Sequence, residues 1–227
     1  MKALSRIITS SIGRKFIMAI TGLALLGFVV AHLLGNLQIF LGPDKFNAYA
    51  KMLKDMPQLI WPARFGLFGV FVLHLVTAIS LKVQNRSARP VAYGCQHTVQ
   101  ASSASLYMVE TGLVILFFVL IHIAHFTLGL LQPDYYYVVD SQNRHDVYSM
   151  VIRGFQHTGF SLFYIFCMLM IGTHLSHGIA SSIQTLGFGN PKVRECAKSI
   201  SCAVGWGIAL GYMSIPLSVL LGLVTLP

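Results

Sequence analysis

The sequence predicts an all-α membrane protein, a bundle of five transmembrane helices. Its 227 residues are 55% hydrophobic and only 10% charged, with a mean hydropathy of +0.69. The apolar residues are concentrated in long runs, each at or above the roughly 20 residues that a helix needs to cross a hydrocarbon core of about 30 Å. Because lipid cannot hydrogen-bond to exposed backbone groups, we expect each run to be helical.

Short loops separate the predicted spans, and no linker, low-complexity tract or obvious repeat divides the chain. We therefore treat residues 1–227 as a single domain. The predicted spans are residues 16–41, 63–81, 106–131, 155–183 and 197–225.

Two longer connections lie on the same side of the predicted membrane. In residues 42–62, the spacing of Phe46, Ala50 and Leu53 predicts an amphipathic helix on the membrane surface. Residues 132–152 are expected to form a loop, with the three consecutive tyrosines at 135–137 at the interface. On the other side, the glycines and proline of residues 187–191 predict the end of the fourth helix.

The net charge of +9 follows the membrane instead of forming one basic tract, which argues against a nucleic-acid surface. The basic residues of one side, opposed only by Glu195, are Lys2, Arg6, Arg14, Lys15, Lys82, Arg86, Arg89, Lys192, Arg194 and Lys198. By the positive-inside rule the N-terminus is cytoplasmic, and five spans place the C-terminus outside. The first apolar run is too long for a signal peptide and lacks a clear cleavage site, so we expect it to be retained.

The fifth span and the cysteines carry little chemistry. Gly207 and Gly211 form a GxxxG motif, which predicts close packing of the fifth helix on a neighbour. That span contains no histidine, so we interpret it as a structural brace. The cysteines Cys95, Cys167, Cys196 and Cys202 form no CxxC pair, and the absence of CxxCH excludes covalently attached haem.

Four histidines, His32, His74, His122 and His174, lie inside four different predicted spans. Ionisable groups within a bilayer are costly and usually functional. At 1.5 Å per residue, His32 and His122 lie about 25 Å from the predicted cytoplasmic boundary, His74 about 12 Å and His174 about 15 Å.

Two histidines at each of two depths predict two b-type haems, each held by imidazoles from two helices. The alternative is four unrelated histidines that hydrogen-bond between helices. The choice of ligand also stays open, because His125 follows His122 by three residues and His177 follows His174 by three, on the same helix faces.

The other ionisable residues have less certain roles. Glu110, the acidic residue inside an apolar segment, either pairs with a cytoplasmic basic group or helps to move protons. His97, His145 and His157 are expected to be solvated.

Several motifs in order resemble the cytochrome b membrane-anchor subunit of succinate dehydrogenase and fumarate reductase, in its single-chain, five-helix, two-haem form. The resemblance covers about residues 8–223. It is carried by Thr9-Ser10-Ser11-Ile12-Gly13-Arg14-Lys15, Thr21-Gly22, His32-Leu33-Leu34-Gly35-Asn36, Phe46-Asn47-Ala48-Tyr49-Ala50, Gln84-Asn85-Arg86, Ala88-Arg89-Pro90 and His174-Leu175-Ser176-His177-Gly178.

The resemblance implies a set of iron ligands. The family's fourth-helix ligand opens an H-x-x-x-G sequence, which matches His174, and its third-helix ligand lies about ten residues beyond a glycine, which matches His122. His125 and His177 are then spare. The resemblance pairs His32 with His122 on an outer haem and His74 with His174 on a haem nearer the cytoplasm. Some members carry a glutamate linked to proton movement where this chain has Gly172, which puts that path in doubt.

The resemblance also implies partners. The chain would anchor a flavoprotein subunit and an iron–sulfur subunit on the cytoplasmic face of a bacterial inner membrane. Through two haems b it would pass electrons to or from a membrane quinone, which we expect to be menaquinone. The chain itself has no GxGxxG motif and too few grouped cysteines to bind flavin or an iron–sulfur cluster, so the succinate or fumarate chemistry belongs to the partners.

The sequence does not identify the quinone site. Ser10, Ser11, Arg14 and Lys15 are conceivable donors to a quinone, although Arg14 and Lys15 are more simply topology anchors. Two alternatives are kept: a cytochrome b anchor of another quinone-linked dehydrogenase, such as a hydrogenase or formate dehydrogenase, and a haem-free transporter.

Overall fold

The computed structural model describes residues 10–88, 91 and 101–227. The sequence predictions that lie outside the described residues concern Lys2, Arg6, Thr9, Arg89, Pro90, Cys95 and His97.

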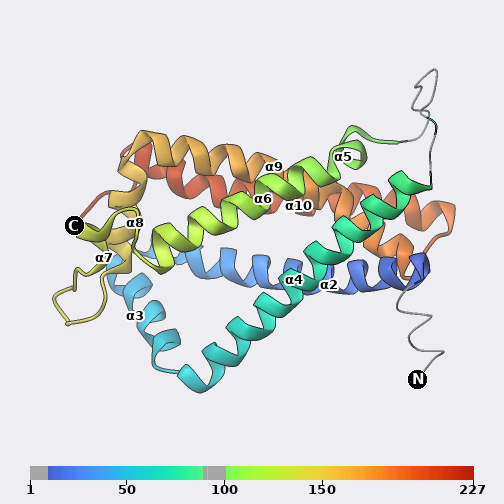
Figure 1. Ribbon diagram of the computed structural model, residues 1–227. Coiled ribbons are helices and arrows are strands. Elements are labelled where there is room, and N and C mark those ends of the chain that lie inside the picture. The colour runs from blue at the N-terminus through green and yellow to red at the C-terminus, as the bar shows by residue number, and fades with distance from the viewer. Residues whose placement is uncertain (1–9, 89–90, 92–100) are drawn as a thin grey trace.

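Among the described residues, five helices are long and apolar enough to cross a membrane, and they confirm the predicted class and the number of spans (Figure 1). They are α2 (Ser11–Asn36), extended by the 3-10 helix η1 (Leu37–Leu41); α4 (Pro57–Ser87); α6 (Met108–His122), extended by the π-helix η2 (Ile123–Thr127); α9 (Thr158–Thr185); and α10 (Pro191–Leu220). The described residues contain no β-strand, only an isolated bridge between Val139 and His145.

The helix ends differ from the predicted ends. Helix α4 continues past the apolar run of residues 63–81 in both directions, because its polar flanks extend the same helix. Helix α10 begins at Pro191, six residues before the predicted 197, where the Asn190 side chain accepts a hydrogen bond of 2.8 Å from the Val193 N–H. Hydropathy detects the apolar centre of a helix, whereas capping residues determine where it begins.

Short helices lie at the end of the bundle where α2 finishes. The amphipathic helix predicted within residues 42–62 is present as α3 (Pro43–Lys54) and buries Phe46 and Asn47. The loop predicted for residues 132–152 is wrong in part, because it contains α7 (Pro133–Tyr136) and most of α8 (Val147–Gln156). At the opposite end, α5 (Ser103–Leu106) precedes α6.

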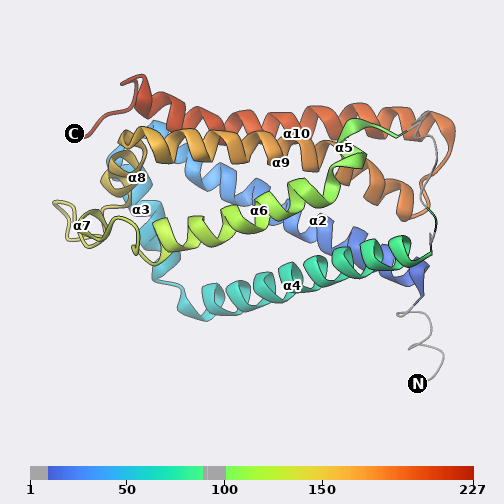
Figure 2. The same ribbon diagram turned by 45° about the horizontal axis from the view of Figure 1, so that its top comes forward.

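The closest helix pair is α9 and α10, which lie side by side along their length (Figure 2). Between them, the buried Ser201 hydroxyl donates to the Ser176 carbonyl at 2.6 Å and accepts from the Ala180 N–H at 3.1 Å. A Cβ on Gly205 would lie 2.7 Å from the Ser176 backbone nitrogen, so only glycine allows this approach.

The interpretation of the GxxxG motif needs correction. A Cβ on Gly207 would meet no atom of another described helix within 4 Å, whereas one on Gly211 would lie 2.9 Å from the Leu33 side chain of α2. The close approach to α9 is therefore made by Gly205, and only Gly211 of the predicted pair faces a neighbouring helix. Sequence spacing identifies candidate glycines, but the rotation of the helix decides which of them faces a partner.

A polar cluster joins α3 to the segment before α8. The Asn47 side chain, 1% exposed, donates to Asp140 at 3.2 Å and Asp146 at 2.9 Å and accepts from the Tyr148 N–H at 2.9 Å. Burial acts to raise the pKa of both carboxyl groups, but hydrogen bonds outweigh it and hold each pKa below its ordinary value of 3.8. This stabilisation is therefore present above pH 3.8 and is lost only as the pH falls further.

Replacing Asn47 with alanine is expected to destabilise this end of the bundle by about 1–3 kcal/mol, because the buried Tyr148 N–H loses its acceptor. Thermal unfolding in detergent measures the change. The control is Gln142→Ala, which removes an exposed 3.0 Å hydrogen bond to Asp44 and should change stability by less than about 0.5 kcal/mol. Equal effects of the two substitutions would contradict a structural role for the buried cluster.

Candidate functional site

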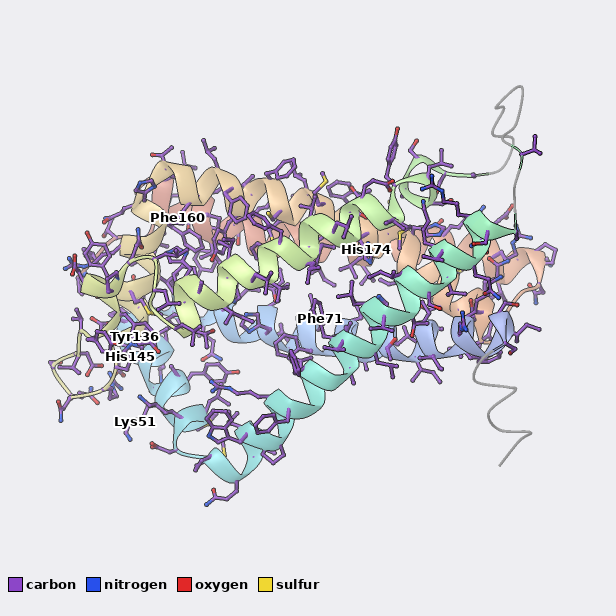
Figure 3. The ribbon with its side chains drawn as sticks, viewed as in Figure 1. Lys51, Phe71, Tyr136, His145, Phe160 and His174 are labelled. Atoms are coloured by element: carbon purple, nitrogen blue, oxygen red, sulfur yellow. The ribbon has the colours of Figure 1, made fainter. Side chains whose placement is uncertain are left out.

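The structure brings the four predicted histidines together as two pairs at two levels of the bundle. The rings of His32 and His122 lie 5.8 Å apart between centres, with an angle of 82° between their planes. His74 of α4 and His174 of α9 lie at the other level, where each contacts a threonine of a neighbouring helix. We call His32 and His122 the outer pair and His74 and His174 the inner pair. Figure 3 shows His174 well separated from Phe160, which lies near the α8 end of the bundle.

The outer pair has a spacing that suits a metal ion between two imidazoles. A metal binds an imidazole nitrogen at about 2.0 Å. The ring centre lies about 1 Å behind that nitrogen, so two axial imidazoles have centres about 6 Å apart. The 5.8 Å between His32 and His122 is close to this value.

In the inner pair, each histidine is held by a threonine of a neighbouring helix. Thr21 Oγ1 in α2 lies 3.1 Å from His74 Nδ1 in α4. Thr111 Oγ1 in α6 lies 3.1 Å from His174 Nδ1 in α9.

The threonines determine which nitrogen of each ring carries the proton. Their hydroxyls donate to backbone carbonyls, Thr21 to Ile17 at 2.7 Å and Thr111 to Tyr107 at 2.9 Å. Each hydroxyl oxygen can then only accept from the histidine, so Nδ1 carries the proton. Nε2 keeps its lone pair, which is the state that a metal-ligating imidazole needs.

The glycine next to each threonine also lies against the ring. A Cβ on Gly22 would lie 3.3 Å from His74 Cε1, and one on Gly112 would lie 3.6 Å from His174 Cε1. At Gly22 the missing side chain allows the close approach of the ring, whereas at Gly112 a Cβ would make only an ordinary contact. At both positions the threonine supplies the hydrogen-bond acceptor. These four residues were not predicted as site residues.

A repeat within the sequence contains the signal that would have found them. Residues 18–32 in α2 and 108–122 in α6 share Met, Thr, Gly, Leu, Leu, Phe, Val and His at the same spacing. In each copy the histidine follows the glycine by ten residues. The expectation of no obvious repeat was therefore wrong. Helices α2 and α6 each supply a Thr-Gly pair to the inner level and a histidine to the outer level.

His125, the alternative to His122, has both ring nitrogens engaged. It is 3% exposed, with Nδ1 3.1 Å from the Tyr164 hydroxyl and Nε2 3.1 Å from the Gln132 side-chain oxygen. Its ring stacks between Phe126 and Phe160, at 3.9 Å and 4.4 Å between centres. Neither nitrogen is free, which favours a structural role for this residue.

The remaining histidines differ in how they are held. His32 stacks on Phe28, and the Asn36 side chain donates to its carbonyl at 2.8 Å while approaching Nε2 to 3.3 Å. The Asn36 side chain must move away from His32 Nε2 before this nitrogen can bind a metal. His177 is half-buried and has no hydrogen bond to any described residue, whereas His174 is held by Thr111.

Two further predictions concern charged residues, Arg14 and Glu110. Arg14 donates to the Ser80 hydroxyl at 2.6 Å, so it ties α2 to α4 at the end that carries the basic residues. Glu110 lies exposed in the first turn of α6 and forms no ion pair with a described residue.

Gly172 is enclosed by the fifth span. A Cβ there would lie 3.0 Å from both Ala209 and Trp206, so a glutamate would not fit without moving α10. This helix therefore does more than brace the bundle. It packs Ala209 and Trp206 against Gly172, and it places Tyr212 near His32, with ring centres 6.2 Å apart.

The described residues contain no group of three or more His, Cys, Asp or Glu side chains able to hold a metal ion. A haem held by two histidines needs only two protein ligands, and each histidine pair offers two imidazoles. The observed set fits such a group at both levels, provided that Asn36 leaves His32 Nε2.

Membrane-length helices with paired imidazoles between them define an integral membrane protein. A comparison with protein families matches residues 82–213, more than half of the chain, to the succinate dehydrogenase/fumarate reductase transmembrane subunit. The chain belongs to this family and is a membrane subunit of that complex. Neither the comparison with curated proteins nor that with solved structures found a match.

Proposed function

We propose that this chain is the membrane-anchor cytochrome b of a succinate:quinone oxidoreductase. Two haems b would be bound, the outer one by His32 and His122 and the inner one by His74 and His174. They would carry electrons between the iron–sulfur subunit and a membrane quinone, with menaquinone as the expected partner. The observation that carries this proposal is the Thr-held Nδ1 of both inner histidines, which leaves Nε2 free to bind iron.

The side chains supply orientation and burial. Thr21 and Thr111 fix the ring planes and tautomers of the inner pair, so little reorganisation is needed when iron binds. A bis-histidine haem has no open coordination position and serves electron transfer. Electron transfer through such haems would not require the described residues to bind oxygen or succinate.

The proposed orientation follows the charges. Helices α2 and α10 begin, and α4 ends, at one end of the bundle, and the basic residues Arg14, Lys15, Lys82, Arg86, Lys192 and Arg194 lie on these termini (Figure 1). We place this end in the cytoplasm of a bacterium, with the flavoprotein and iron–sulfur subunits docked there, and the C-terminus outside.

The test is an optical spectrum of the chain purified with its partners. We expect b-type bands in the reduced-minus-oxidised spectrum, two haems per chain, and reduction of at least one haem by succinate. A flavoprotein and an iron–sulfur protein should co-purify. A purified complex without b-type bands would contradict the proposal.

A further inference from the structure

A buried chain of hydrogen-bonded side chains lies at the outer level, and it includes the two contacts of His125 described above. It runs from Gln132, at the end of the bundle, through His125 and Tyr164 to His122. We call these four residues the outer relay. Three of them lie in the apolar interior, where polar groups are costly unless they are hydrogen-bonded.

We propose that Gln132, His125 and Tyr164 fix the tautomer of His122 and thereby set the reduction potential of the outer haem. This inference rests on the proposed function, because it assigns a role toward a haem that His122 would bind. We call these three side chains positioning residues, since none of them would touch the iron: Gln132, His125 and Tyr164.

The direction of every hydrogen bond follows from the Gln132 end. The amide oxygen of Gln132 can only accept, so His125 Nε2, 3.1 Å away, must donate. A neutral imidazole carries one proton, which leaves His125 Nδ1 as an acceptor. The Tyr164 hydroxyl, 3.1 Å from this nitrogen, must then donate to it.

The last link orients His122. Because the Tyr164 hydroxyl donates its hydrogen bond to His125, the Tyr164 oxygen can accept one from His122 Nδ1. The two atoms lie 3.5 Å apart, the outer limit of a hydrogen bond. His122 then carries its proton on Nδ1 and presents the Nε2 lone pair. The relay thus does for the outer level what Thr111 does for His174 at the inner level.

The surroundings hold the relay in one arrangement. The His125 ring lies between Phe126 and Phe160, and the Tyr164 ring, 5% exposed, packs edge-on against Phe118 and Phe155. These contacts restrict both rings to the orientation in which their polar atoms meet.

The two levels differ in what accepts the proton of the ligating histidine. A hydrogen-bond acceptor on Nδ1–H makes an imidazole more electron-donating, which stabilises ferric iron and lowers the reduction potential. At the outer level that acceptor is the oxygen of Tyr164, whose hydroxyl hydrogen is donated to His125. Removing it should raise the potential of the outer haem and leave the inner haem unchanged.

The experiment is a redox titration of the whole complex, resolved into its two haems, for the wild type, Tyr164→Phe and Gln132→Leu. Tyr164→Phe keeps the ring and removes the hydroxyl. The matched control is Tyr212→Phe, because the Tyr212 hydroxyl donates to the Val29 carbonyl at 2.8 Å and forms no hydrogen bond with His122. Haem content is measured on the same samples.

We expect a positive shift of one midpoint potential in Tyr164→Phe and a smaller positive shift of the same haem in Gln132→Leu. Tyr212→Phe should leave the potential of that haem where it is in the wild type. If the Tyr164→Phe complex lacks the outer haem, the Gln132→Leu complex provides the test. A positive shift of its outer-haem potential supports the relay, and an unchanged potential overturns it.

Failure of the relay proposal and failure of the proposed function would give different results. Two bound haems with unshifted potentials in both relay variants would overturn the relay alone and leave the proposed function standing. A wild-type complex without haem would overturn the proposed function, and the relay with it.

Discussion

Replacing His122 with alanine is expected to remove one of the two haems, whereas replacing His125 with alanine should leave both bound. His122 faces His32 across 5.8 Å, and the Ala side chain offers no ligand in its place. His125 cannot take over, since both of its nitrogens are already hydrogen-bonded and its ring is stacked between two phenylalanines. The two substitutions therefore separate a ligand from a neighbour on the same helix face.

The measurement is the haem content per chain from the reduced pyridine spectrum of the purified complex. The expected values are about one haem for His122→Ala and about two for His125→Ala, since one axial pair supplies both ligands of each haem. Retention of both haems in His122→Ala together with loss of one in His125→Ala would reverse the assignment of the third-helix ligand.

Placing a methyl group on Gly205 is expected to destabilise the bundle strongly. The added Cβ of Gly205→Ala would lie 2.7 Å from the Ser176 nitrogen and 3.1 Å from the Gly172 carbonyl oxygen, both backbone atoms that a side-chain rotation cannot move. Helices α9 and α10 would have to separate, at a cost of about 1–3 kcal/mol or more. The separation would also disturb the Ser201 hydrogen bonds and His174 on α9.

Gly207→Ala is the control for this experiment, because its Cβ would meet no atom of another described helix within 4 Å. We expect a change within about 0.5 kcal/mol, as for other substitutions on an open surface. Thermal unfolding in detergent, followed by the loss of helical signal, compares the two variants. A Gly207→Ala variant that is less stable than Gly205→Ala would show that the original GxxxG interpretation was correct.

Much of the architecture could be predicted because the bilayer imposes simple requirements on a sequence. Apolar length fixed the number and order of the spans, and the period of Phe46, Ala50 and Leu53 identified α3. Helix α8 was missed although its sequence carries two local signals, an N-capping Asp146 and a strongly amphipathic pattern of residues.

The four candidate ligands were predicted from depth, and the family resemblance selected His122 and His174 over their neighbours. Their assignment to haem iron stays a prediction. What the sequence reading missed was the support around them. Thr21 and Thr111 look like ordinary helix residues, and Gln132 lies in a segment treated as a loop. Their importance appears only when helices distant in sequence place them against histidine nitrogens.

The sequence by itself determined that this chain crosses a membrane five times and buries histidines at two depths, because hydropathy and helix rise act locally along the chain. Only the tertiary structure decided that Gly205 and not Gly207 meets α9, that His125 is fully hydrogen-bonded, and that threonines orient the inner imidazoles. Those outcomes depend on the rotation of each helix about its axis. That rotation is set by packing between helices, so no single segment encodes it.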